Sequence, residues 1–325
     1  MTLIERAGRA LPRPLHRSLW CGWDLVHGRW PRALADRTLA RAARDPITFN
    51  QKVLHRMAVD RRPLLRTFAD KVAVRTYVTD RLGSGYLAEC FGAYEAGGAI
   101  SWGDLPRQFA CKTSHASGGA VLVWEGAPRV PLPPDASKLT WPRLLVHPED
   151  LVREDLARLC DGWLSLNYEY GPGRFPEWAY RDIPPRILIE ELLVTRGGLP
   201  SDYRFFVFDG RCALVVVDRG RFEHHKRDLF TPGWDVIPVS YGYPRPSVPS
   251  SRPEHLGTML AVAEALGAGV DFVRIDLYDV DGRIVVGELT IYPRAGKNVS
   301  SSASFDRWLA AQWTLPGGGS ELPRA

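Results

Sequence analysis

The stretch "FVRIDLYDVDGRIVVGELT" (residues 272–290) decides the fold, because it reads as a β-hairpin that also carries a row of charged residues. We expect strands over 272–278 and 283–290, joined at "DVDG", whose Asp-Gly pair supplies the positive φ of a tight turn. Alternation places three apolar residues on one face of the first strand, and Arg274, Asp276 and Tyr278 on the other. In the second strand Glu288 and Thr290 share a face, with the apolar Val286 between them and the turn.

The carboxylates of this hairpin suggest a metal site. Asp276 and Glu288 lie on facing strands, so they could converge on one hard cation such as Mg²⁺. The alternative is a cross-strand pairing of Arg274 with a carboxylate, which contributes only ~0.2–1 kcal/mol. The residues alone leave both readings open.

Length and composition indicate an ordinary globular protein. The 325 residues are 45% hydrophobic and 24% charged, enough for more than one lobe. No apolar run is long enough to span a membrane, and Arg and Pro interrupt the first twenty residues, which argues against a secretory signal. The five cysteines are odd in number and form no C-x-x-C motif, so we expect a reducing, cytoplasmic environment.

Charge is unevenly distributed along the chain. Residues 1–66 hold 14 Lys+Arg against 5 Asp+Glu, whereas the remainder holds 28 against 32. Such a basic segment could meet nucleic acid or an anionic surface. Arg interleaved with Leu, Ala and Trp is more typical of solvated faces of amphipathic helices, so we expect no nucleic-acid partner and no membrane span.

The order of elements predicts an α+β protein. Helices are expected over 45–60, 61–82, 147–167 and 254–266, and strands over 107–114, 120–126 and 185–194, with a further hairpin over 202–220. The expected organisation is a basic helical extension (1–45), an N-terminal lobe (46–105), a small lobe (106–195), a C-terminal lobe (196–315) and a disordered tail (316–325).

Two further segments have the composition of a nucleotide site. "CKTSHASGGAVLV" (111–123) has a lysine before a Gly-rich turn between strands, as in a flap over a polyphosphate. A plain turn is the alternative, and the lysine precedes the glycines, so this is no P-loop. "RILIEELLV" carries Glu190 and Glu191 in an apolar run, which fits either an edge strand or a hinge that contacts adenine.

In their order, these segments resemble the TupA-like family of the ATP-grasp superfamily. The resemblance rests on "TFNQKVLHRM", "LLRTFADKVAVRTYV", "LPRQFACKTSHASGG", "PPRILIEELL", "DYRFFVFDG" and "DFVRIDLYDVDGRIVVGELT", and spans roughly 45–300. It implies an ATP-grasp fold, in which two α+β lobes hold ATP between them, and the cofactors ATP and Mg²⁺, with two metal ions.

The resemblance also implies roles for individual residues. The metal ligands would be Asp276, Glu288 and Thr290, although Thr290 stands where the wider superfamily has Asn, so a water could bridge it to the metal. Catalytic roles fall to Lys112, Arg204 and Arg274. Nucleotide-binding roles fall to Lys71, Lys112, Ser117, Gly118, Gly119, Glu190, Glu191, Leu192, Asp202 and Arg204.

The substrate site is less well defined. Arg274, on the metal face, could hold a substrate carboxylate, and Arg294, Lys297 and Asn298 could meet the acid or the amine. A solvated polar loop is the alternative for the last three. We interpret His115 as a hydrogen-bonding or solvated residue rather than a base, and "FEHHKR" (222–227) as a surface loop.

The implied activity is a carboxylate–amine ligase that works through an acyl phosphate and releases ADP and phosphate. Its partners would be a small-molecule, peptide or glycan carboxylate and an amine, and a homodimer is possible. A kinase and a non-catalytic nucleotide-binding module are the alternatives. Retention of Lys112, Arg204, Asp276 and Glu288 argues against the module, because a degenerate site would tolerate losing some of them.

Overall fold

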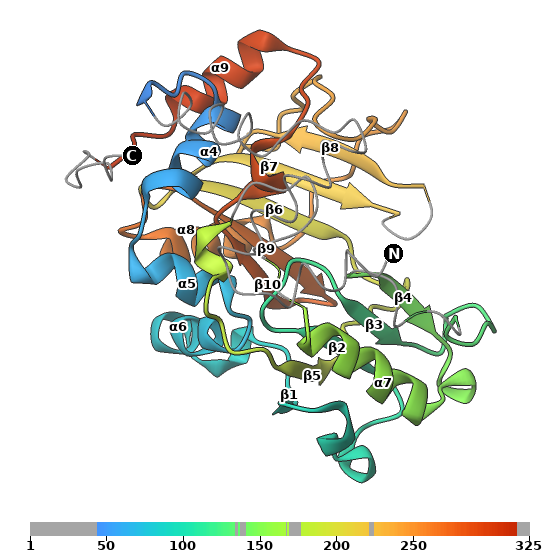
Figure 1. Ribbon diagram of the computed structural model, residues 1–325. Coiled ribbons are helices and arrows are strands. Elements are labelled where there is room, and N and C mark those ends of the chain that lie inside the picture. The colour runs from blue at the N-terminus through green and yellow to red at the C-terminus, as the bar shows by residue number, and fades with distance from the viewer. Residues whose placement is uncertain are drawn as a thin grey trace, which may run out of the picture. The chain divides into compact units, whose positions relative to one another are not determined.

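The computed structural model describes residues 44–133, 136, 141–166, 168, 177–220 and 224–316, which form two compact units (Figure 1). Of these residues, the first unit contains Ala69–Ala73 and Ala88–Leu192, and the second contains 44–68, Val74–Leu87 and 193–316. Each unit has a five-stranded sheet, and helices accompany both, so the predicted α+β class is confirmed. The predicted extension and tail lie outside the described residues, apart from 44–45 and 316.

The sheet of the first unit has the strand order β1-β5-β2-β3-β4. Its neighbours are antiparallel except β3 and β4, which are parallel. The strands are β1 (Cys90–Tyr94), β2 (Phe109–Thr113), β3 (Ala120–Val123), β4 (Arg143–Val146) and β5 (Ile187–Glu191). Because β5 lies between β1 and β2, it is an internal strand of the sheet.

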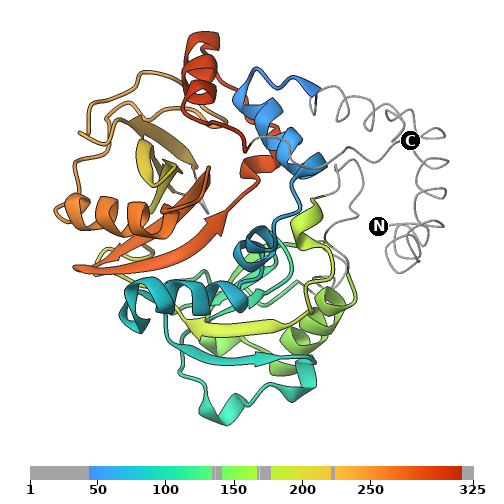
Figure 2. The same cartoon turned by 90° about the vertical axis from the view of Figure 1, so that its left-hand side faces the viewer.

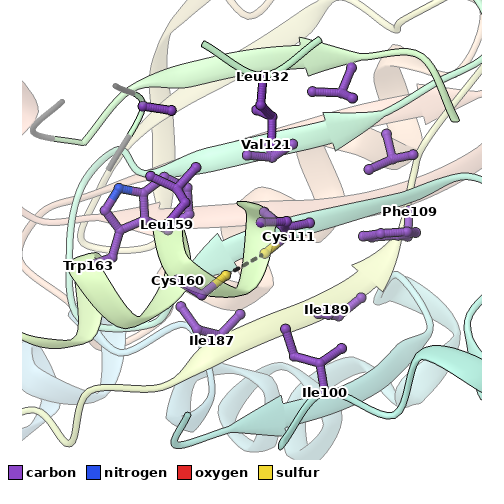
Figure 3. Packing of buried hydrophobic residues seen from close by; sticks show 14 residues of the cluster. Ile100, Phe109, Cys111, Val121, Leu132, Leu159, Cys160, Trp163, Ile187 and Ile189 are labelled. Carbon is purple, nitrogen blue, oxygen red and sulfur yellow. Dashed lines mark hydrogen bonds between the residues drawn. The ribbon is translucent and has the colours of Figure 1, made fainter. Parts of the chain in front are cut away.

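Helix α7 (Arg153–Leu164) covers one face of this sheet (Figure 3). Its buried residues recur at three- and four-residue spacing, the period of one helix face: Leu156, Leu159, Cys160 and Trp163. They pack against the strands, where the Sγ atoms of Cys111 and Cys160 lie 3.6 Å apart (Figure 3). The helix predicted over 147–167 thus starts later than expected, after a short 3₁₀ helix, η5 (Pro148–Asp150).

The sheet of the second unit is antiparallel throughout, in the order β10-β9-β6-β7-β8. Its strands are β6 (Asp202–Phe208), β7 (Arg211–Arg219), β8 (Lys226–Phe230), β9 (Val273–Val280) and β10 (Arg283–Thr290). Helix α8 (Leu256–Gly267), orange in Figure 2, packs against β6, β7 and β9. Helices α4 (Phe49–Val59) and α9 (Ala303–Ala311) lie side by side in both views (Figures 1 and 2).

The hairpin predicted over 272–290 is confirmed as β9 and β10, with one departure from strict alternation. A β-bulge lies between Val286 and Glu288, so Val286 faces Leu277 while Glu288 faces Asp276. The extra residue is Gly287, where a Cβ would lie only 2.5 Å from the ring of Tyr278. The bulge therefore moves Val286 to the core side and leaves Glu288 beside Asp276.

The single helix predicted over 61–82 is wrong. The chain forms α5 (Pro63–Ala69) and α6 (Ala73–Leu82) instead. Between them the backbone N–H of Lys71 donates to the carbonyl of Ser114 (3.2 Å), and that of Val72 donates to Oδ1 of Asp70 (2.8 Å). These two N–H groups are thus taken from the helical hydrogen-bond pattern, which ends the first helix.

Candidate active site

One face of the second unit's sheet carries a row of charged side chains. Arg204 on β6 lies directly opposite Asp276 on β9, which in turn lies opposite Glu288 on β10. Side chains of directly opposed residues share a face. The intervening residues on these strands, among them Phe205 and Ile275, are fully buried on the other face. Alternation thus separates an apolar core face from a polar site face.

Asp276 is the centre of this row. Arg274 donates two hydrogen bonds to it, from Nε to Oδ1 and from Nη2 to Oδ2, both 2.6 Å long. Nε of Arg204 lies 3.6 Å from Oδ2. Burial raises the pKa of the Asp276 carboxyl, although the charges of Arg274 and Arg204 oppose this shift. Arg274 and Arg204 thus both pair with the Asp276 side chain.

Glu288 is more accessible than Asp276. Oγ1 of Thr290 donates to its Oε1 (2.6 Å), and Nη2 of Arg274 lies 4.0 Å from the same oxygen. The Thr290 hydroxyl therefore orients the Glu288 carboxylate. Arg274 lies within reach of both carboxylates.

These residues fit a magnesium ion. Mg²⁺ prefers oxygen ligands and is commonly held by one or two carboxylates, with phosphate and water completing its shell. Asp276 and Glu288 supply such oxygens from adjacent strands. Among the described residues, no group of three or more His, Cys, Asp and Glu side chains is arranged to bind a metal without such help. A cation at Asp276 would have to compete with Arg274, which occupies both of its oxygens.

Asp218, which the sequence analysis did not single out, extends the polar face onto β7. Its side chain is fully buried and accepts two hydrogen bonds from Arg227, with distances of 2.6 and 2.7 Å, and Nη1 of Arg204 lies 2.8 Å from Oδ2. Burial works against ionisation, but Arg227 and Arg204 hold the pKa of Asp218 below its ordinary value. Burial alone would lower the pKa of Arg204, but the charges of Asp276 and Asp218 outweigh that effect and raise it. An acid ending the apolar run "ALVVVD" is the sequence signal that could have revealed Asp218.

Asp202, at the start of β6, lies across from Asp218 on β7 and is buried. Its Oδ1 accepts a hydrogen bond from the hydroxyl of Tyr278 (2.9 Å). Asp202, Arg204, Asp276 and Tyr278 thus belong to one connected polar face.

In the first unit, Lys112 on β2 forms an ion pair with Glu190 on β5. Both lie on the sheet face opposite the α7 core, because their neighbours in sequence, Cys111 and Ile189, belong to that core. Glu190 is buried, so the lysine supplies a partner of the kind that a buried carboxylate requires.

The predicted hinge, 190–192, belongs partly to the sheet. The backbone N–H of Glu191 donates to the carbonyl of Glu89 (2.8 Å), and Oε2 of Glu191 accepts from the N–H of Glu89 (3.2 Å). Leu192 follows the end of β5.

The Gly-rich loop after β2 is packed inside the first unit. Gly118 and Gly119 have φ values of 112° and 65°, which favour glycine, and a Cβ at either would lie about 3 Å from Trp141 (3.1 and 3.0 Å). The ammonium of Lys71 donates to the carbonyl of Ala116. This hydrogen bond holds the Lys71 side chain against the loop, which also contains the partly buried Ser117.

His115 is buried in the same loop, and its Nε2 lies 3.3 Å from the carbonyl oxygen of Trp163. Burial lowers the pKa of His115 to about 4, so the ring is neutral near pH 7. This confirms the hydrogen-bonding interpretation.

The predicted substrate residues follow β10. Arg294 belongs to the turn η7 (Pro293–Gly296), and its carbonyl accepts from the backbone N–H of Lys297 (3.1 Å). Asn298 is buried, and its backbone carbonyl accepts from Nδ2 of Asn50 on α4 (2.6 Å).

The interpretation of 222–227 as a surface loop is wrong in part for 224–227, and residues 222 and 223 lie outside the described residues. His224 is exposed, but the ring of His225 stacks on Tyr243 at a centroid distance of 3.6 Å, and the strand β8 begins at Lys226. The two neighbouring histidines thus differ in exposure, because the ring of Tyr243 covers part of His225.

A comparison with protein families matches a segment that begins within α7 and includes the predicted hinge and the polar sheet face. Residues 157–314 match the TupA-like ATP-grasp family. The predicted resemblance is thus confirmed over slightly less than half of the chain, and the TupA-like segment begins well after the 45 expected from the sequence. No curated protein matches the sequence.

Several solved structures are similar to this chain at low identity. The ATP-grasp ligase PsnB with its minimal precursor is 12% identical, with a TM-score of 0.36 and coverage of 70% of this chain and 53% of PsnB. The ADP complex of PurK, N5-carboxyaminoimidazole ribonucleotide synthetase, is 10% identical, with a TM-score of 0.42 and coverage of 71% and 46%. D-alanine–D-alanine ligase from Bacillus anthracis with ATP is 12% identical, with a TM-score of 0.39 and coverage of 71% and 56%. The chain matches about half the length of these proteins. Within its described residues, no helix is long and apolar enough to cross a membrane.

Proposed function

We propose that this protein is an ATP-dependent ligase that joins a carboxylate to an amine and releases ADP and phosphate. The observation that carries the proposal is the pair of Asp276 and Glu288, opposed on adjacent strands beside Arg204 and Arg274. This pair lies within the segment that matches the TupA-like ATP-grasp family. The substrate class we favour is a small metabolite, a peptide or an envelope glycan.

In the second unit, Asp276 and Glu288 would hold Mg²⁺, and Thr290 would keep the Glu288 carboxylate in place through its 2.6 Å hydrogen bond. When bound, Mg²⁺ neutralises charge on a transferring phosphoryl group. Arg204 and Arg274 would stabilise the same developing charge, and Asp202 would contact the ribose. Ion pairs with buried acids hold both guanidinium groups in position before any substrate binds.

In the first unit, Lys112 and Lys71 would bind phosphate oxygens, together with the loop of Ser117, Gly118 and Gly119. A polyphosphate would compete with Glu190 for Lys112. The segment of Glu190, Glu191 and Leu192 would contact adenine. Because β5 is paired on both sides, the backbone groups of Leu192, beyond the strand end, are the best suited to this contact.

The reaction has two displacement steps. A carboxylate oxygen of the substrate attacks the γ-phosphorus of ATP, and ADP leaves. The amine then attacks the acyl carbon, phosphate leaves, the nitrogen loses a proton, and an amide results. Neither step needs a protein nucleophile, so the side chains act by positioning and charge stabilisation.

The test is release of ADP and of free phosphate with Mg²⁺ and ATP, using amino acids, small peptides and uronic-acid sugars as substrates. Both products should appear only when a carboxylate and an amine are present together. ADP formed with one hydroxylated substrate, without free phosphate, would show a kinase instead.

Glu288→Gln is the sharper variant, because Glu288 is more exposed than Asp276 and its loss threatens the fold less. Changes to residues that only support a metal ligand typically cost 10–100-fold, so loss of a direct ligand should lower turnover by more than about 100-fold. Asp281→Asn is the matched control, since Asp281 is exposed in the turn of the same hairpin. Wild-type turnover in the Glu288 variant would refute the metal assignment.

A further inference from the structure

The turn η7 holds three successive residues in the left-handed region of backbone space. The φ values are 49° at Arg294, 50° at Ala295 and 67° at Gly296. Two of these residues are not glycine, and such a conformation persists only where the surroundings enforce it. Helix α4 packs against this turn so closely that a Cβ at Gly296 would lie 2.7 Å from the carbonyl oxygen of Asn50. The strained turn therefore fixes the direction in which Arg294 leaves the backbone.

A second segment runs beside this one. Tyr241 forms an isolated β-bridge with Ser300, and the backbone N–H of Gly242 donates to the carbonyl of Val299 (2.8 Å). Gly242 has a φ of 76°, a backbone conformation that residues with a side chain rarely adopt. A Cβ at this position would lie 3.1 Å from Oδ1 of Asn298, 3.3 Å from Nη1 of Arg227 and 3.5 Å from Nη1 of Arg294. Three polar side chains thus converge on one glycine: that of Arg227 from β8, and those of Arg294 and Asn298 from the segment that follows β10.

An aromatic ring forms the floor of this cluster. The guanidinium carbons of Arg227 and Arg294 lie 4.7 and 5.4 Å from the centroid of the Tyr243 ring. The ring of His225 stacks on the same tyrosine at 3.6 Å, with an interplanar angle of 26°. Tyr243 therefore has a fixed orientation and gathers two cationic groups, which attract its π-system but repel each other.

The carboxylate beside Arg227 is already paired. The nearby carboxylate, Asp218, is shared by Arg227, Arg204 and His225. Arg227 uses Nε and Nη2 for Asp218 and Nη1 for the carbonyl of Tyr241. Within the described part of the chain, Arg294 forms no ion pair, and the buried Oδ1 of Asn298 has no hydrogen-bond partner.

We propose that Arg294, supported by the charge of Arg227 and by the Tyr243 platform, binds a carboxylate of the substrate. The inference rests on the proposed ligase function and adds Tyr243, His225 and Arg227 to its substrate site. The planar fork of a guanidinium matches the two oxygens of a carboxylate, and the aromatic ring offers a surface for the carbon skeleton that carries it. Arg294 supplies the donors, because those of Arg227 are already engaged.

Ligand-observed NMR titration of the full chain, saturated with ADP and Mg²⁺, tests this subsite. The probes are D-glucuronate, glutarate and inorganic phosphate, with neutral D-glucose as the reference. We expect glucuronate or glutarate to bind the wild-type protein, and Arg294→Gln to weaken that binding by about 10- to 100-fold, the value of a charged hydrogen-bonded contact. Arg294 is exposed, so the variant should fold.

The other variants separate the ring from the charge. Tyr243→Leu should weaken binding, whereas Tyr243→Phe should leave it unchanged, because the platform needs the ring and not the hydroxyl. Arg252→Gln is the matched control, because Arg252 is exposed and lies, like Tyr243, between β8 and α8. This variant should bind as the wild type does.

Three results would overturn the inference while leaving the ligase proposal intact, provided that ADP with Mg²⁺ still binds. In the first, neither carboxylate binds the wild-type protein. In the second, the carboxylates bind Arg294→Gln as tightly as they bind the wild type. In the third, phosphate is the single probe whose binding depends on Arg294. Failure of wild-type protein to bind ADP with Mg²⁺ would refute the proposed function itself.

Discussion

Replacing Asp271 with Asn should destabilise the second unit strongly, because Asp271 is the counter-charge of a buried arginine. Its Oδ2 lies 2.6 Å from Nη2 of Arg56, whose side chain is 1% exposed, and it also accepts from Nε1 of Trp313 (2.7 Å). Oδ1 lies 2.7 Å from Nη2 of Arg62. Burial opposes the charge of Asp271, but Arg56, Arg62 and Trp313 hold the pKa of this carboxyl below its ordinary value.

The magnitude follows from what the substitution leaves behind. Removing one partner of a buried ion pair costs about 3–5 kcal/mol, since the remaining charge is uncompensated. The amide oxygen of Asn still accepts one hydrogen bond, and Asp60 remains 3.8 Å from Nε of Arg56. We therefore expect the lower end of that range, about 3 kcal/mol.

Urea unfolding at pH 7, followed by tryptophan fluorescence, measures this loss. Asp209→Asn is the matched control, because Asp209 is an exposed turn residue with a φ of 47°, which Asn tolerates. A free energy of unfolding for Asp271→Asn within about 0.5 kcal/mol of that control would refute the reasoning.

The same pair predicts a pH dependence with a definite sign. Because the folded-state pKa of Asp271 is lowered, its contribution is present above the unfolded-state pKa of about 3.9 and is lost as the pH falls through the folded value. The difference between wild type and Asp271→Asn should therefore shrink as the pH is lowered below about 4.

Three further predictions concern local features. His115 should titrate near pH 4 by NMR. In the unfolded chain it takes up a proton near pH 6.5, so the free energy of unfolding should fall by up to about 3 kcal/mol between pH 6.5 and 4. Titration of the folded protein near 6.5 would contradict its burial. Gly287→Ala should cost about 1–3 kcal/mol in urea unfolding, because the new Cβ would lie 2.5 Å from the Tyr278 ring. The control Gly257→Ala should be neutral or stabilising, because Gly257 lies inside α8 and its added Cβ would meet no atom within 4 Å. Equal effects of the two substitutions would show that the bulge does not need glycine. Thr48→Ala should cost about 1 kcal/mol, because Thr48 and Gln51 form the capping box of α4, while Thr48→Ser should retain most of the stability; an unchanged melting curve for the alanine variant would argue against the cap.

Local patterns were enough to predict the elements that carry the site. Alternation and the Asp-Gly turn gave the β9–β10 hairpin, and the same features gave β6 and β7. Spacing of apolar residues indicated α7 and α8. These predictions hold because strand and helix periods are properties of neighbouring residues, so the chain displays them without reference to distant partners.

Only the tertiary structure decided what depends on residues far apart in the chain. The contact of Lys71 with Ser114 divides what looked like one helix, and a β-bulge at Gly287 shifts the hairpin register. Asp218 follows an apolar run in the sequence, and sheet pairing places it opposite Asp202 and against Arg227. Its ionised form is stable there only because distant arginines offset the cost of burial, and no local pattern can report that balance.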